Sequence, residues 1–132
     1  MREILFRGKA EGCKVWLYGD LRHWSEKRKG IYDYAWGRTY DVDASTVGQF
    51  TGLIDGKGKK IFDGDIVRHY NGSEDLFDTG RVYWDADFCG WRRTTDNVFH
   101  PGVPGSYRMS ASCDYEVIGN IHDNCWEEFR WQ

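Results

Sequence analysis

The sequence has little of what marks a secreted, membrane-bound or strongly basic protein. Its 132 residues include only two prolines and no apolar run near the roughly 18 residues that a membrane-spanning helix needs. Residues 1–7 lack the long apolar segment of a secretory signal. The formal net charge is −3 with both signs spread along the chain, so there is no overall attraction to nucleic acid. These features predict a cytoplasmic protein with no membrane partner.

Cysteines are few and none forms a Cys-x-x-Cys pair. An even count could give two disulfides, but cytosolic proteins keep their thiols reduced, so we expect free thiols at all four positions. His122 lies close to Cys125 in the sequence, but zinc needs four ligands and no second close pair is present. We therefore predict no metal and no cofactor. The four cysteines are Cys13, Cys89, Cys113 and Cys125.

Aromatic residues and glycines are abundant instead. The chain holds seven Trp, eight Tyr, seven Phe and sixteen Gly. Aromatic side chains suit the half-buried surface of a sheet, and glycines suit tight turns. The sequence thus predicts a mostly β fold, a compact antiparallel assembly in a single domain. Strands are expected at 3–7, 14–18, 31–36, 38–42, 80–84, 88–93 and 115–121.

The segment 47–67 organises the expected fold. Asp55-Gly56 and Asp63-Gly64 both read as turns, because glycine tolerates the positive φ of a sharp reversal. Strand ends are expected at 60–62 and from Asp65 to residue 67. The pattern is typical of the turns that enter barrel strands in SH3-like folds, an analogy at the level of fold only. We therefore predict an N-terminal β part (about 1–45), an SH3-like barrel-type half (about 46–122) and a tail (123–132).

The remaining segments give weaker local predictions. Gly19-Asp20 is expected to break or bulge the second strand, and the charged residues 25–29 to form a hairpin tip. Asp43 is expected to cap a single turn, since its carboxylate can accept from backbone N–H groups. Residues 94–112 read as a long loop, and Asp123 as the cap of a short C-terminal helical turn.

Two stretches interleave basic and aromatic residues. Single-stranded nucleic acid is bound by such surfaces, through stacking and phosphate attraction. The alternative is a solvated hairpin tip and a sheet edge on which the arginines extend to water. The candidate binding surface comprises Arg22, Trp24, Lys27, Arg28, Trp91, Arg92 and Arg93.

A third stretch alternates aromatic residues, with Tyr32, Tyr34 and Trp36 on one side of an expected strand. Aromatic side chains are enriched at the cores of protein interfaces, but a small β fold also needs them for its own core. We expect about half of them to be buried and the remainder to form a contact surface. That contact could be with a protein partner, or with a second copy of the chain through edge strands.

Catalytic motifs are not evident. Residues 55–60 (DGKGKK) lack the spacing and the following helix of a phosphate-binding loop. Asp63, Asp65, Asp85 and Asp87 form two Asp-x-Asp pairs that could hold a divalent cation if their strands pair. The simpler interpretation is that these aspartates bond to nearby backbone amides in turns. The sequence therefore predicts a protein that is not an enzyme.

Three blocks of sequence resemble the YopX family of phage and prophage proteins. They comprise residues 1–9 with 16–21, residues 46–53 (TVGQFTGL) with 60–67 (KIFDGDIV), and residues 115–124 (YEVIGNIHDN). The resemblance implies a mostly β fold, a setting inside a bacterial host and no established activity. Residues 80–112 match the family only in their strand-turn-strand outline, and residues 125–129 replace its usual tail.

Together, these observations predict a non-enzymatic accessory protein that binds another macromolecule. A protein partner is the first expectation, and the alternative is a nucleic-acid-binding β-barrel module that uses the basic and aromatic surface.

Overall fold

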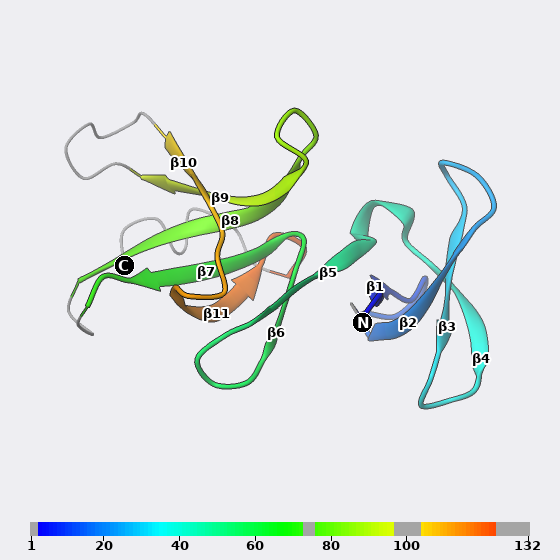
Figure 1. The fold of residues 1–132 in the computed structure, drawn as a ribbon. Helices are drawn as coiled ribbons and strands as arrows, with labels where there is room; N and C mark the ends of the chain where they lie inside the picture. The colour runs from blue at the N-terminus through cyan, green and yellow to red at the C-terminus, as the bar shows by residue number, and fades with distance from the viewer. Residues whose placement is uncertain (1–2, 73–75, 97–103, 124–132) are drawn as a thin grey trace. The chain divides into compact units, whose positions relative to one another are not determined.

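The computed structural model describes residues 3–72, 76–96 and 104–123 (Figure 1). They form strands and one turn of 3-10 helix, which confirms the mostly β class. The chain divides into two compact units, Met1–Gly52 and Leu53–Gln132. The elements are β1 (Phe6–Lys9), β2 (Trp16–His23), β3 (Lys29–Asp33), β4 (Arg38–Val42), η1 (Ala44–Thr46), β5 (Gly48–Ile54), β6 (Lys60–Phe62), β7 (Asp65–Tyr70), β8 (Phe77–Asp85), β9 (Gly90–Asp96), β10 (Pro104–Arg108) and β11 (Asp114–Asn120).

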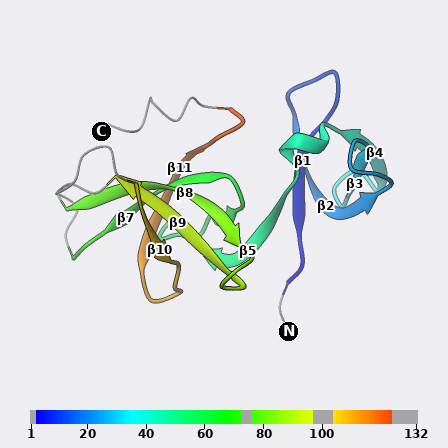
Figure 2. The same cartoon turned by 90° about the horizontal axis from the view of Figure 1, so that it is seen from above.

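The first unit contains strands β1 to β4, which form an antiparallel sheet that curls on itself (Figure 2). The full strand order of this sheet is β4-β3-β2-β1-β5-β6, in which β5 passes from the first unit into the second and β6 belongs to the second. The end of β4 bonds to the chain after β1, through an Ala10–Val42 bridge and a 2.8 Å bond from the Asp43 N–H to the Lys9 carbonyl. Leu17, Ile31 and Val42 form the buried core inside this curl.

Two predictions for this unit are confirmed and two are wrong. Residues 24–28 form the hairpin tip between β2 and β3, and the Asp43 carboxylate caps η1 by accepting from the Ser45 N–H at 3.0 Å. However, β2 continues through Gly19 without a break. A Cβ there would lie 1.7 Å from the Tyr32 carbonyl oxygen, so the glycine lets β2 and β3 run close together. The expected strand 31–36 also ends early, because β3 stops at Asp33.

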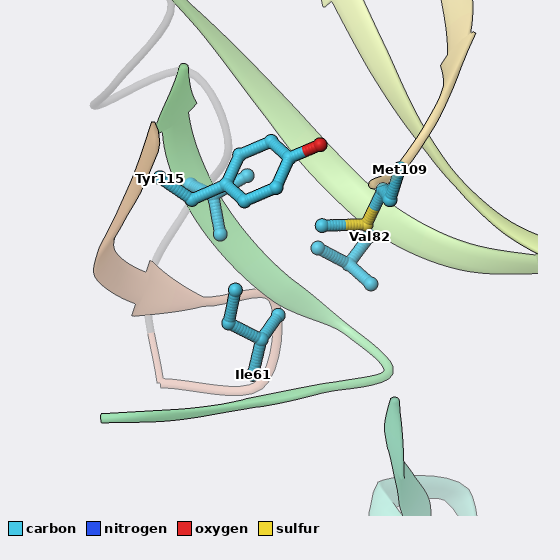
Figure 3. Packing of buried hydrophobic residues seen from close by; sticks show 5 residues of the cluster. Ile61, Val82, Met109 and Tyr115 are labelled. Atoms are coloured by element: carbon cyan, nitrogen blue, oxygen red, sulfur yellow. The ribbon is translucent and has the colours of Figure 1, made fainter. Parts of the chain in front are cut away.

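The second unit contains an antiparallel sheet with the order β10-β9-β8-β7-β11. Its core is a cluster of five buried side chains, four of which are labelled in Figure 3. The expected SH3-like barrel is not found, since the described strands form an open sheet and no closed barrel. The core residues are Ile61, Val67, Val82, Met109 and Tyr115.

The two turns of the central segment lie at the predicted positions, but in one of them a different glycine has the positive φ. Gly64 has a φ of +87°, as expected for the turn between β6 and β7. In the turn between β5 and β6 the positive φ is at Gly58 (+84°) and not at Gly56. The Gly56 N–H instead bonds to the Tyr115 carbonyl at 2.9 Å, so this glycine joins the turn to β11.

Part of the expected loop 94–112 forms strands instead. β9 continues to Asp96, and β10 (Pro104–Arg108) pairs with it. The expected C-terminal helical turn falls on residues 124–132, which lie outside the described residues. Cys13, Cys89 and Cys113 are free thiols, and Cys125 lies outside the described residues.

Candidate functional site

A buried carboxylate organises a group of aromatic residues at the turn between β3 and β4. Asp33 is 6% exposed. Its Oδ1 accepts from the Trp36 N–H at 2.9 Å, and its Oδ2 accepts from the Tyr18 N–H at 3.4 Å. The Gly37 N–H bonds to the Asp33 carbonyl at 2.8 Å and closes the turn. One side chain thus fixes the backbone at two aromatic positions that are 18 residues apart in sequence.

The same turn holds two further tyrosines in contact. The Tyr34 hydroxyl donates to Asp20 Oδ1 at 2.5 Å, and this bond raises the pKa of Tyr34. The Tyr32 and Tyr34 rings meet edge to face, with centroids 6.3 Å apart. We call Tyr18, Tyr32, Tyr34 and Trp36 the aromatic corner. Tyr18 is 42% exposed, Tyr34 56% and Trp36 72%, while Tyr32 is half-buried, so the larger part of this group faces solvent.

The hairpin tip between β2 and β3 carries the first half of the predicted basic surface. The Arg28 guanidinium lies 4.4 Å from the centre of the Trp24 ring and 3.6 Å from an Asp41 carboxylate oxygen. Arg22 lies over the Tyr32 ring at 5.7 Å, and Lys27 is exposed. The arginines here are already engaged with aromatic rings, and Arg28 also has an acidic partner.

The second half of the predicted surface is split between the two faces of β9. Trp91 and Arg93 lie on the core face with Val82, and Arg92 lies on the opposite face, because side chains alternate along a strand. Arg93 is 4% exposed, and Trp91 is half-buried and packs against the core. Arg93 is therefore buried and not exposed as the prediction required, whereas Trp91 keeps part of its surface accessible.

Arg93 belongs instead to a buried polar cluster with His69 and Asp78. Its Nη1 donates to Asp78 Oδ1 at 2.6 Å, and its Nη2 lies 2.9 Å from His69 Nδ1. Arginine can only donate, so Nδ1 of His69 accepts and the imidazole carries its proton on Nε2. Burial lowers the pKa of His69, and the positive charge of Arg93 lowers it further, while Asp78 raises it.

On the opposite face, Arg92 is held by a serine of the neighbouring strand. Its Nε donates to Ser106 Oγ at 2.8 Å and its Nη2 to the Ser106 carbonyl at 3.0 Å. Asp85 lies 3.8 Å from Nε, and the guanidinium sits 5.2 Å from the centre of the exposed Phe88 ring. Of the three second-unit residues in the predicted binding surface (Trp91, Arg92 and Arg93), Arg92 alone has its side chain on the outer face of the sheet.

The four aspartates that could have held a cation are not brought together. Asp65 is 1% exposed and accepts from the Phe62 N–H at 2.8 Å, and Asp63 lies in the adjoining turn. Asp85 accepts from the Asp87 N–H at 3.0 Å across a separate turn. Within the described residues, no group of three His, Cys, Asp or Glu side chains could hold a metal ion.

Asp55 joins the turn between β5 and β6 to the last strand. Its Oδ1 accepts from the Lys57 and Lys59 N–H groups at 2.9 and 2.8 Å, and its Oδ2 accepts from the Val117 N–H at 3.0 Å. Burial raises the pKa of the Asp55 carboxyl, but the bonds from Val117, Lys59 and Lys57 outweigh it and lower the pKa. Asp55 is therefore structural, and so are its neighbours in the turn.

Sequence reasoning missed three residues that shape these surfaces. Asp33 had a readable signal, since aspartate side chains commonly stabilise turns by accepting from nearby backbone N–H groups. Ser106 and Asp78 had none, because each acts on a residue of another strand, 14 and 15 positions away. Such pairs depend on strand register, which a single sequence does not specify.

The fold described above belongs to a chain whose sequence matches a known protein family over most of its length. The model of the YopX protein family matches residues 5–126. The chain therefore belongs to the YopX family. Among curated proteins, none matches the sequence. In the described part of the chain, no helix has the length and apolar character to cross a membrane.

Proposed function

We propose that this YopX-family chain is a phage-type accessory protein of the bacterial cytoplasm that binds a protein partner through the aromatic corner and does not catalyse a reaction. The observation that carries the proposal is the exposure of Tyr18, Tyr34 and Trp36 around the buried Asp33 carboxylate. Family membership fits a phage-type role and gives no activity to transfer.

The chemistry of the corner supports a protein contact. Trp and Tyr dominate the binding energy of protein interfaces because they bury a large area with few rotatable bonds. Here the Asp33 bonds and the Tyr34–Asp20 bond fix the backbone and one ring before any partner arrives. A surface ordered in advance loses less conformational entropy on binding.

The basic and aromatic surface predicted from the sequence supports nucleic-acid binding less well. Its seven residues are divided between the two units, Arg93 is buried, and Arg28 has Asp41 and Trp24 as partners. The protein-binding role therefore has the stronger support.

The test is affinity capture from host cells with nuclease-treated extract, followed by binding measurements with the purified partner. Wild-type protein is expected to retain the partner, and Trp36→Ala and Tyr34→Ala to weaken binding by about 2 kcal/mol each, as at interface hot spots. Phe88→Ala, an exposed aromatic of the second unit, is the matched control. Equal binding by all variants would contradict the proposal that the aromatic corner binds the partner. If the wild-type protein self-associates and Trp36→Ala does not, the partner is a second copy of the chain.

A further inference from the structure

The outer face of β8, β9 and β10 presents a grid of arginines with hydroxyl groups between them. Across the three strands, Tyr83 pairs with Arg92 and Arg92 with Arg108. On the same face, Thr94 of β9 is opposite Ser106 of β10, and Arg81 donates its backbone N–H to Thr94 Oγ1 at 3.0 Å. Side chains of directly opposed residues lie on one face, so all of these groups share a surface. We call it the arginine face: Arg81, Tyr83, Arg92, Thr94, Ser106 and Arg108.

Like charges stand directly opposite one another on this face. Arg92 and Arg108 are a cross-strand pair, an arrangement that destabilises a sheet by mutual repulsion. Arg81 and Arg108 are exposed, and within the described residues neither forms a salt bridge. Among the described side chains that β8, β9 and β10 place on this face, one is acidic. It is Asp85, whose Oδ2 lies 3.8 Å from Arg92 Nε. Among the described side chains of these strands, three positive charges therefore stand against one negative charge, a balance that favours an anionic ligand.

The central guanidinium is fixed in position. Two hydrogen bonds to Ser106 hold Arg92, and the Tyr83 hydroxyl lies 2.6 Å from Ser106 Oγ. Beside it, Phe88 is 65% exposed with its ring centre 5.2 Å from the Arg92 guanidinium. Cationic groups and an open aromatic ring thus lie next to each other.

We propose that the arginine face binds single-stranded nucleic acid. Arg81, Arg92 and Arg108 would neutralise backbone phosphates, and the Phe88 ring would stack on a base. Stacking favours a single strand over a duplex, because bases within a duplex are already stacked and do not offer a face to Phe88. It also favours nucleic acid over an acidic peptide, which would use the arginines but not the ring. This site is separate from the aromatic corner, and its test does not depend on the protein-binding role.

The test is fluorescence anisotropy of the full-length protein with labelled single-stranded DNA and RNA at several salt concentrations. For three phosphate contacts, log K is expected to fall with log[salt] with a slope of about −2. Arg81→Gln and Arg108→Gln should each reduce the slope by about 0.7. Phe88→Ala should weaken binding roughly 5- to 100-fold while leaving the slope nearly unchanged.

Arg38→Gln is the matched control, because Arg38 is an exposed arginine of the first unit and the substitution removes the same charge. Unchanged circular dichroism and melting temperature show that each variant is folded. Absence of binding at low salt would overturn the proposal. So would equal competition by polyglutamate, an unaltered affinity in Phe88→Ala, or a loss in Arg38→Gln as large as that in Arg108→Gln, since each indicates nonspecific attraction.

Discussion

At the scale of single residues, three aspartates each stabilise a turn. Asp33, Asp43 and Asp55 each accept backbone N–H groups at a turn, where the strand ladder leaves those donors unpaired. Asp33 and Asp55 also reach donors far away in the sequence, so they fix tertiary structure as well as the local turn.

Asp55→Ala should be among the more destabilising substitutions at a polar position. It removes a nearly buried carboxylate and leaves three backbone N–H groups without their acceptor, at a cost of roughly 2–4 kcal/mol. Urea unfolding at pH 7 measures the loss. Asp87→Ala, at an exposed turn position, is the control and should change stability by about 0.5 kcal/mol or less.

The Asp55 carboxyl also predicts a pH dependence. Its folded pKa is below the ordinary value of 3.8, so its stabilisation is complete above that value and is lost as pH falls through the folded pKa. Acid unfolding should therefore be less steep in Asp55→Ala than in the wild type below pH 4. If the free energy of unfolding fell equally steeply with pH in both proteins, Asp55 would make no contribution to the pH dependence of stability.

His69 gives a second pH dependence at a higher pH. Its pKa is lowered from 6.5, so the unfolded chain binds a proton more readily than the folded one. Stability should be complete above pH 6.5 and decrease as pH falls toward the folded pKa. His69→Gln keeps an acceptor for Arg93 and cannot titrate, so its stability should change less between pH 7 and pH 5. ¹⁵N NMR should also find the wild-type proton on Nε2, and a proton on Nδ1 would contradict the Arg93 contact.

At the scale of elements, close approach between strands depends on two glycines. Cβ atoms at Gly19 and Gly80 would each lie 1.7 Å from a carbonyl oxygen of the neighbouring strand, of Tyr32 and Thr94 respectively. Backbone cannot move aside as a flexible side chain can, so these pairs of strands tolerate no larger residue. The same tight pairing of β8 and β9 fixes which arginines face outward.

Gly80→Ala should force β8 away from β9 and cost about 1–3 kcal/mol or more, as overpacked sites do. Gly90→Ala is the control, since its nearest neighbour would lie at an ordinary 3.7 Å. Chemical denaturation compares the two. A Gly80→Ala protein as stable as Gly90→Ala would contradict the observed spacing of the strands.

At the scale of the whole molecule, two units with separate cores share one chain. Ile31 belongs to one cluster and Ile61 to the other, and both are fully buried. The two clusters have no residue in common.

Ile31→Ala and Ile61→Ala should each cost about 2–5 kcal/mol, because each leaves a cavity in a packed core. Hydrogen exchange followed by mass spectrometry should show the loss of protection in the first unit for Ile31→Ala and in the second unit for Ile61→Ala. Val15→Ala, at an exposed position, is the control. Loss of protection throughout the chain in either variant would show a single cooperative unit.

The sequence predicted local features well and long-range ones poorly. The hairpin tip at 24–28, the Asp43 cap and the turn at Gly64 depend on neighbouring residues, and all three were found. The position of Arg93 depends on Asp78, and β10 depends on pairing with β9, so neither could be read from adjacent residues. The described strands form no closed barrel, and the sequence could not decide this because closure depends on register between distant strands.

The Asp55–Val117 contact has a consequence for synthesis on the ribosome. Strands β1 to β4 can pair with one another early, but β7 gains its neighbour β11 only after residue 120 has emerged. Until then β7 exposes one row of unpaired N–H and carbonyl groups, and the turn at Asp55 lacks one of its donors. A nascent second unit is therefore open to wrong pairing for most of its translation, and a chain truncated before Asp114 keeps that edge permanently.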